Sequence, residues 1–236
     1  MAGLAPTRSL PVSHFTLGCD VLQRSRKADV SLAYPADRQT LVTAGTFFKH
    51  KGLPDLVAAM ESLWAEDCEM RLVLLGGDSH KRSVRTHLSS LPAFGSTLFM
   101  PGYVSDMELA ETMSRCGALV CASSDEDFGL PLVEAAALGC PIITRDIEVF
   151  REISGGKAFF FENGDAGKIA EALRKWFALT REQQLRFVPK ESLVTWKQSA
   201  EMLKAIMFQG AASVSVEVGL NATVNLAVPS RTAGAV

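Results

Sequence analysis

The residues with the clearest chemical potential lie in the segment 123–134, which reads Ser-Ser-Asp-Glu-Asp-Phe-Gly-Leu-Pro-Leu-Val-Glu. A short apolar run precedes it, and a helical pattern begins near Pro131. Gly129 allows a ligand to approach the backbone closely, and the start of the helix favours a phosphate group. Carboxylates repel phosphate but accept hydrogen bonds from sugar hydroxyl groups well, so Glu126 and Glu134 indicate a ligand that carries hydroxyls.

Several interpretations of this segment remain open at this level. Asp125, Glu126 and Asp127 could hold a divalent metal ion, although three successive acids rarely converge on one ion. Glu126 and Glu134 could be the acid and base of a glycoside hydrolase, but eight residues of one helix separate them by about 12 Å, beyond the roughly 5–9.5 Å of such pairs. The spacing best fits one nucleotide-sugar held at two points, with its diphosphate at the helix start. A solvated acidic loop explains the segment, taken alone, about equally well.

The elements that must position these residues alternate between two kinds of segment from residue 41 to about 178. Strand-length apolar runs are typical of strands buried on both faces; they are 41–44, 71–75, 97–100, 118–121, 141–144 and 158–161. Helical patterns lie between them, with capping boxes predicted at Ser105/Glu108 and Thr180/Gln183 and an N-cap at Asp165. Repeated strand–helix–strand units predict an α/β fold, a Rossmann-like doubly wound parallel sheet with helices on both faces, whose ligands sit at the carboxyl ends of the strands.

The motifs together resemble those of family 4 retaining glycosyltransferases, the glycosyl transferases group 1, which have the GT-B fold. Glu126 and Glu134 match the EX7E signature of that family. Further similar stretches, in the family's order, are Leu17–Asp20, Gly45–Gly52, Leu72–Gly76, Gly102–Leu109, Glu148–Glu152 and Trp196–Ala200. The resemblance covers about residues 14–207 and implies the C-terminal, nucleotide-sugar-binding domain of a GT-B enzyme.

The resemblance also implies a role for each matching residue. Glu126 would face the donor sugar, and Lys51 would neutralise the diphosphate leaving group, so these two are the candidate catalytic residues. Glu134 would bind the ribose diol. The remaining donor-binding candidates are Phe128, Gly129 and Leu130 at the diphosphate or sugar, Tyr103 and Val104 at the base, and Gly45 and Thr46 in the first turn. The family needs no metal, so no cofactor is expected.

Two departures from the family pattern matter. Thr46 stands where many members have arginine. If Leu17–Asp20 is the interdomain linker, the acceptor-binding domain is missing from this chain. We therefore expect residues 1–36 to be an N-terminal segment with a linker remnant, 37–208 to be the donor domain, and 209–236 to be a flexible tail in which the strand-like run 213–218 has no obvious partner.

The expected function is transfer of a hexose, with retention, from a donor such as GDP-mannose or UDP-glucose to a glycan or lipid-linked hydroxyl acceptor. The alternatives are a non-catalytic nucleotide-sugar-binding subunit or truncated remnant that needs a separate acceptor-domain chain, and a GT-B nucleotide-sugar epimerase. The patterns GxGxxG, GxxxxGK[ST] and GxSxG are absent from the sequence, which argues against a nicotinamide dehydrogenase, a P-loop enzyme and an α/β-hydrolase.

Composition agrees with a globular protein of this kind. The 236 residues are 47% hydrophobic and 21% charged, with a formal net charge of -2, so a dedicated nucleic-acid binder is not expected. Five scattered cysteines without CxxC spacing indicate a reducing compartment. Without a signal peptide or an apolar run of about 20 residues, we expect a cytoplasmic location with at most peripheral membrane contact. Trp64, Trp176 and Trp196 all fall in helical patterns and are expected in the core.

Overall fold

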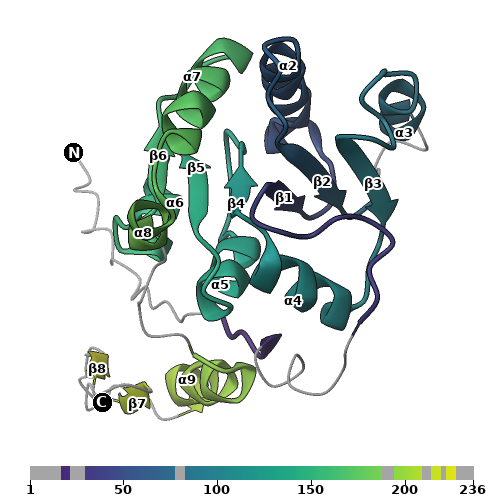
Figure 1. Ribbon diagram of the computed structural model, residues 1–236. Helices are drawn as coiled ribbons and strands as arrows, with labels where there is room; N and C mark the ends of the chain where they lie inside the picture. The colour runs from purple at the N-terminus through teal and green to yellow at the C-terminus, as the bar shows by residue number, and fades with distance from the viewer. Residues whose placement is uncertain are drawn as a thin grey trace, which may run out of the picture. The chain divides into compact units, whose positions relative to one another are not determined.

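The computed structural model describes residues 17–21, 30–77, 83–187, 194–208, 214–218 and 222–226 (Figure 1). The chain divides into two compact units, one formed by residues 19–191 and the other by residues 1–18 with 192–236. The candidate site residues all belong to the first of these units, which has the α/β architecture predicted from the sequence.

The first unit contains a six-stranded parallel sheet in the order β3-β2-β1-β4-β5-β6. The strands are β1 Thr40–Ala44, β2 Arg71–Leu75, β3 Leu98–Gly102, β4 Ala118–Cys121, β5 Ile142–Arg145 and β6 Phe159–Phe161. The chain winds outward in one direction from β1 to β3 and in the other from β4 to β6. The topological switch therefore lies between β1 and β4, where α/β sheets bind their ligands.

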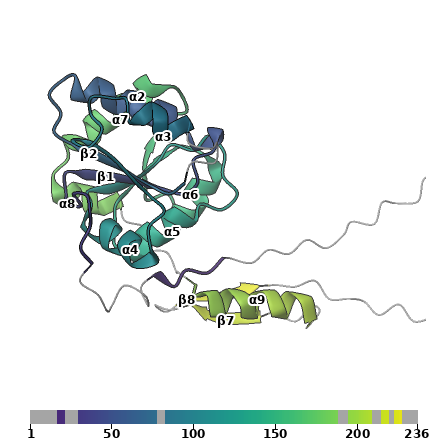
Figure 2. The same ribbon diagram turned by 90° about the vertical axis from the view of Figure 1, so that its right-hand side faces the viewer.

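Helices cover both faces of the sheet (Figure 2). Their bounds are η1 Lys49–Lys51, α2 Leu53–Trp64, α3 Ser83–Leu88, α4 Asp106–Arg115, α5 Leu130–Ala137, α6 Glu148–Ser154, α7 Ala166–Phe177, α8 Arg181–Gln184 and η2 Leu185–Phe187. One core cluster joins the sheet to α2 and α7, and the other joins it to α4, α5 and α6. Neighbouring residues of β1 show why both faces are apolar, since Leu41 belongs to the first cluster and Val42 to the second.

The predicted helix caps are confirmed. Ser105 Oγ accepts from the Glu108 N–H, while Glu108 Oε2 accepts from the Ser105 N–H at 2.8 Å. Thr180 and Gln183 form the second capping box, and Asp165 accepts from two N–H groups at the start of α7. The caps at Ser105 and Asp165 start α4 and α7 a few residues after β3 and β6, and the cap at Thr180 starts α8 directly after α7.

The predicted strands 71–75 and 118–121 are confirmed at both ends, and the other four differ from the prediction by one or two residues at one end or both. The clearest case is β5, which was expected over 141–144 and runs from Ile142 to Arg145. The charge of Arg145 argues against a strand, but its side chain is 2% exposed and hydrogen-bonds to Ala122, Asn163 and Gly164. Those partners satisfy the guanidinium group, so the strand continues through it.

The expectation for the tryptophans is only partly correct. Trp176 is fully buried, and Trp64 is half-buried with its indole N–H donating to the Met70 carbonyl at 2.7 Å. Trp196 is 44% exposed, so its prediction as a core residue is wrong. It is the first residue of α9, and helical spacing alone does not show which face of a helix is covered.

The second unit contains α9 Trp196–Phe208 and two strands, β7 Val214–Val218 and β8 Ala222–Leu226. The sequence places α9 with the Rossmann-like domain, whereas the structure groups it with this unit. The sequence shows no obvious partner for the strand-like run 213–218, and in the structure β7 pairs with β8 in an antiparallel ladder. Within the described residues, no helix is both long enough and apolar enough to cross a bilayer.

Candidate functional site

A cavity of about 470 Å³ opens at the carboxyl ends of the strands, beside the switch between β1 and β4. It is lined from the turns after β1, β2, β3 and β4 and from the first turns of α5. All ten residues singled out from the sequence line it: Gly45, Thr46, Lys51, Tyr103, Val104, Glu126, Phe128, Gly129, Leu130 and Glu134. The fold thus brings together residues spread over 90 positions of the chain, although lining a cavity does not by itself assign their roles.

The start of α5 forms one wall of the cavity. Gly129 is its N-cap, with φ +78°, and Pro131 lies in the first turn. A β-carbon at Gly129 would also lie 3.0 Å from the Phe150 ring, so glycine suits both the backbone angle and the close packing. The first N–H groups of α5 and the positive end of its dipole therefore border the cavity, an arrangement that suits an anion.

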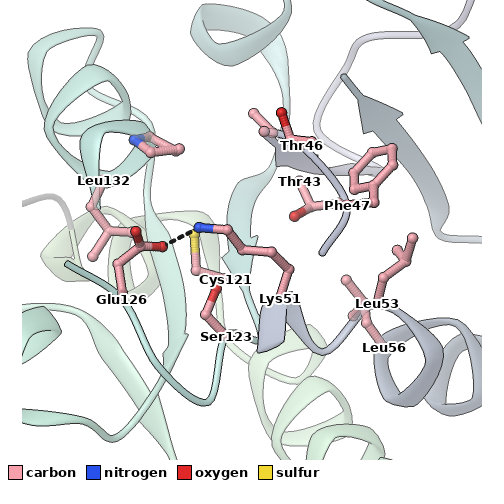
Figure 3. A pocket seen from close by; sticks show the side chains of 13 residues that line it. Thr43, Thr46, Phe47, Lys51, Leu53, Leu56, Cys121, Ser123, Glu126 and Leu132 are labelled. Carbon is pink, nitrogen blue, oxygen red and sulfur yellow. Dashed lines mark hydrogen bonds and ion pairs between the residues drawn. The ribbon is translucent and has the colours of Figure 1, made fainter. Parts of the chain in front are cut away.

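Lys51 and Glu126 face each other across the switch point (Figure 3). Lys51 Nζ lies 2.5 Å from Glu126 Oε2, and the two side chains are 25% and 15% exposed. Their loops are also tied together, because the Ser124 N–H donates to the His50 carbonyl at 2.8 Å. The geometry places one cation and one carboxylate in contact within the lining of the cavity.

Glu134 has a different environment. It is half-buried in the second turn of α5, and no hydrogen-bond partner for its carboxylate is found within the described part of the chain. Burial, with a smaller contribution from the charge of Asp106, raises the pKa of Glu134 from 4.5 to about 7. A carboxylate held in this way has its full acceptor capacity available to a ligand.

On the opposite side of the cavity, glycines allow the backbone turns after β1 and β2 to lie close together. Gly76 has φ +135°, and a β-carbon there would collide with the Gly45 carbonyl oxygen. The turns after β1 and β2 can approach each other only because this position lacks a side chain. Next to them the Tyr103 ring lies over Gly77 and is 80% exposed. The cavity thus has a backbone floor near Gly45 and Gly76 and an aromatic edge at Tyr103.

Some lining residues were not singled out from the sequence as site residues: Ala44, Leu75, Gly76, Leu109, Asp127 and Pro131. Gly76 repeats the strand-then-glycine pattern of Gly45, and that pattern was the available signal. Asp127 was considered only as a metal ligand, and it is exposed at the rim. In the described residues, no three His, Cys, Asp or Glu side chains are grouped to hold a metal ion.

Comparison with known proteins identifies the family. The model of the family "Glycosyl transferases group 1" matches residues 25–191. The serotype-specific mannosyltransferase WbdA of Escherichia coli is 35% identical over 209 residues, which are 84% of this chain and 25% of WbdA. The phosphatidyl-myo-inositol mannosyltransferase of Mycolicibacterium smegmatis is 28% identical over 165 residues, or 65% of this chain and 39% of that protein.

Solved structures agree with the fold. Sucrose-phosphate synthase from Thermosynechococcus elongatus matches with a TM-score of 0.61 and 26% identity over 83% of this chain and 49% of that one. WaaG, a glycosyltransferase involved in lipopolysaccharide biosynthesis, matches with a TM-score of 0.56 and 19% identity over 73% and 48% of the two chains. This chain spans about a quarter of the length of the WbdA sequences it resembles. It has the Rossmann-like fold of GT-B glycosyltransferases and belongs to the glycosyl transferases group 1 family.

Proposed function

We propose that this chain is the donor-binding domain of a retaining, metal-independent hexosyltransferase. The observation that carries the proposal is the convergence of all ten candidate residues on one cavity at the switch point. This domain would bind a nucleoside-diphosphate sugar, whose hexose is transferred to a hydroxyl group of a glycan or lipid-linked acceptor. The expected cytoplasmic location and the absence of a cofactor stay predictions.

The proposed roles follow from the chemistry of each position. Glu134, half-buried and without a partner among the described residues, accepts hydrogen bonds from the ribose diol. The first N–H groups of α5 hold the diphosphate. Lys51 stabilises the negative charge that develops on the leaving diphosphate, and Glu126 contacts the sugar. Tyr103 and Val104 border the base, with Gly45 and Thr46 beneath the sugar.

We propose mannose as the transferred sugar and GDP-mannose as the donor. Support comes from the relatives, since the WbdA proteins at 35–36% identity and the more distant phosphatidyl-myo-inositol enzyme are all named mannosyltransferases. UDP-glucose is the comparison donor, because a different base and sugar test both parts of the assignment at once.

A second candidate is a donor-binding module that does not catalyse by itself. The observation in its favour is that the chain spans about a quarter of the WbdA sequences, so a complete enzyme of that kind contains further parts. A module of this kind binds donor as the full enzyme does and transfers no sugar until an acceptor-binding chain is added. An epimerase would instead convert the nucleotide-sugar without any acceptor.

The experiment is a thermal unfolding series with GDP, UDP, ADP, GDP-mannose and UDP-glucose. Ligand at about 100 times its dissociation constant stabilises a protein by ~2.7 kcal/mol, which for a chain of this size corresponds to roughly 5–10 °C. We expect this rise with GDP-mannose and its loss in Glu134→Ala. The matched control is Glu148→Ala, which removes an exposed glutamate of α6 outside the cavity. A folded protein that no nucleotide stabilises would contradict the proposal, as would a Glu134→Ala variant that binds as the wild type does.

A further inference from the structure

The Lys51–Glu126 ion pair sets the charge that a diphosphate meets in the cavity. Nζ and Oε2 are 2.5 Å apart, and both side chains are largely shielded from solvent. Among the described residues that line the cavity, Lys51 is the one cation, whereas Glu126, Asp127 and Glu134 are acidic. Because Glu126 neutralises Lys51, the charged side chains that line the cavity give an anion little net attraction, and the N–H groups at the start of α5 supply most of it.

The surroundings limit how far this pair can separate. The loops are joined at the His50 carbonyl, which accepts from the Ser124 N–H at 2.8 Å and from Ser124 Oγ at 3.3 Å. A second cavity, lined by Lys51 and Glu126 themselves and by Thr43, Cys121 and Ser123 among others, has a volume of only about 20 Å³, which is room for a single water (Figure 3). The Glu126 carboxylate therefore stays near any phosphate that reaches Lys51.

We infer that the Lys51–Glu126 pair makes this site favour a nucleoside diphosphate that carries a sugar over the free nucleoside diphosphate. The inference rests on the proposed function and adds a selectivity for donor over product. Glu126 is then a specificity-determining residue in addition to any part it takes in the transfer.

The physical reason is that the Glu126 carboxylate has different partners when the free diphosphate is bound and when the sugar-carrying diphosphate is bound. A free diphosphate at Lys51 competes with Glu126 for the ammonium group and repels the carboxylate, which gains no hydrogen-bond donor in return. A diphosphate esterified by a sugar carries less charge, and its sugar supplies hydroxyl donors to the same carboxylate. Once the sugar has been transferred, this compensation is lost, so release of the diphosphate product is favoured.

The test is calorimetric titration of the full chain with GDP and with GDP-mannose. We expect Glu126→Gln to bind GDP about tenfold more tightly than the wild type, because Lys51 is freed and a like charge is removed. Its affinity for GDP-mannose should stay unchanged or fall, so the preference for donor over product shrinks. In the background of Lys51→Ala, Glu126→Gln should give a clearly smaller gain in GDP affinity, because only the removal of the like charge remains.

The matched control is Asp127→Asn. Asp127 lines the same cavity, and its substitution removes the same charge without touching the Lys51 contact. An equal gain in GDP affinity for Asp127→Asn would overturn the inference, because it would show a general charge effect. An unchanged or weaker GDP affinity for Glu126→Gln would also overturn it.

If the proposed function is wrong, the folded wild type binds neither GDP nor GDP-mannose. That result would contradict the proposed function, and with it the inference. If Glu126→Gln does not fold, Glu126→Asp replaces it, since the shorter carboxylate retracts from Lys51. Tighter GDP binding by Glu126→Asp supports the inference, and unchanged binding overturns it.

Discussion

Replacing Glu134 by glutamine should make the protein more stable at high pH while weakening its donor site. The pKa of Glu134 is raised from 4.5 to about 7, chiefly by burial. The folded protein therefore binds more protons than the unfolded chain between these two pH values. The free energy of unfolding then falls as the pH rises through this window, and the stabilisation is lost above about pH 7.

The magnitude follows from these two pKa values. Between pH 5 and pH 8.5 the wild type should lose roughly 2.5 kcal/mol of stability relative to Glu134→Gln, which has no group to ionise. For a chain of this size the difference corresponds to about 5–10 °C in melting temperature. At pH 5 the protonated glutamate and the glutamine are nearly equivalent, so the two proteins should differ little there.

The assay is urea denaturation of both proteins at pH 5, 6, 7, 8 and 8.5. Glu61→Gln is the control, because Glu61 is exposed on α2, away from the cavity, and its substitution should give a curve parallel to the wild type. A stability difference between Glu134→Gln and the wild type that does not change with pH would refute the reasoning. A difference that grows toward low pH would refute it as well, because it would mean that the folded protein favours the ionised carboxylate.

Three further predictions concern a glycine beside the site, the buried Trp176 and the need for a metal. Gly52→Ala should lower the free energy of unfolding by at least about 2 kcal/mol in urea denaturation, because φ is +65° and the new β-carbon would collide with the Ala122 carbonyl oxygen; an unchanged midpoint would contradict this. Trp176→Ala should cost about 3–5 kcal/mol by the same method. Trp176→Phe should cost less, since the buried indole N–H has no hydrogen-bond partner among the described residues. EDTA should leave sugar transfer, measured with any acceptor that the complete enzyme accepts, unchanged; activity restored only by a divalent cation would show that the reaction needs a metal.

The environment of Glu134 lowers the stability of the fold but suits the proposed binding of the donor. Burying a carboxylate without a partner destabilises the fold when the group is ionised, yet an unpaired carboxylate is what a diol requires. The glycines at 52, 76 and 129 are similar, because each is needed for close contacts around the cavity. Residues that weaken or strain the fold thus gather at the proposed site, which is common where a protein binds a ligand.

Much of the fold and of the candidate site was predictable from local signals. Apolar runs of strand length alternate with capped helical patterns, and this alternation predicts a parallel sheet because only buried strands tolerate such runs on both faces. The caps at Ser105, Asp165 and Thr180 were correct because each depends on hydrogen bonds within three residues of the cap. The Glu126–Glu134 segment was informative for the same reason, since its strand, turn and helix are adjacent in the chain.

Other features depend on contacts that no local pattern contains. Lys51 and Glu126 are 75 positions apart and meet only because β1 and β4 pair at the switch point. Arg145 continues a strand because partners at Ala122, Asn163 and Gly164 surround its charge. Trp196 is exposed although its helix is amphipathic. Strand β7 pairs with β8, which the sequence of β7 alone does not indicate. The sequence by itself determined which elements form and which chemical groups they carry, because propensity and capping act over a few residues. Only the tertiary structure decided which groups meet, because burial and pairing depend on strand order.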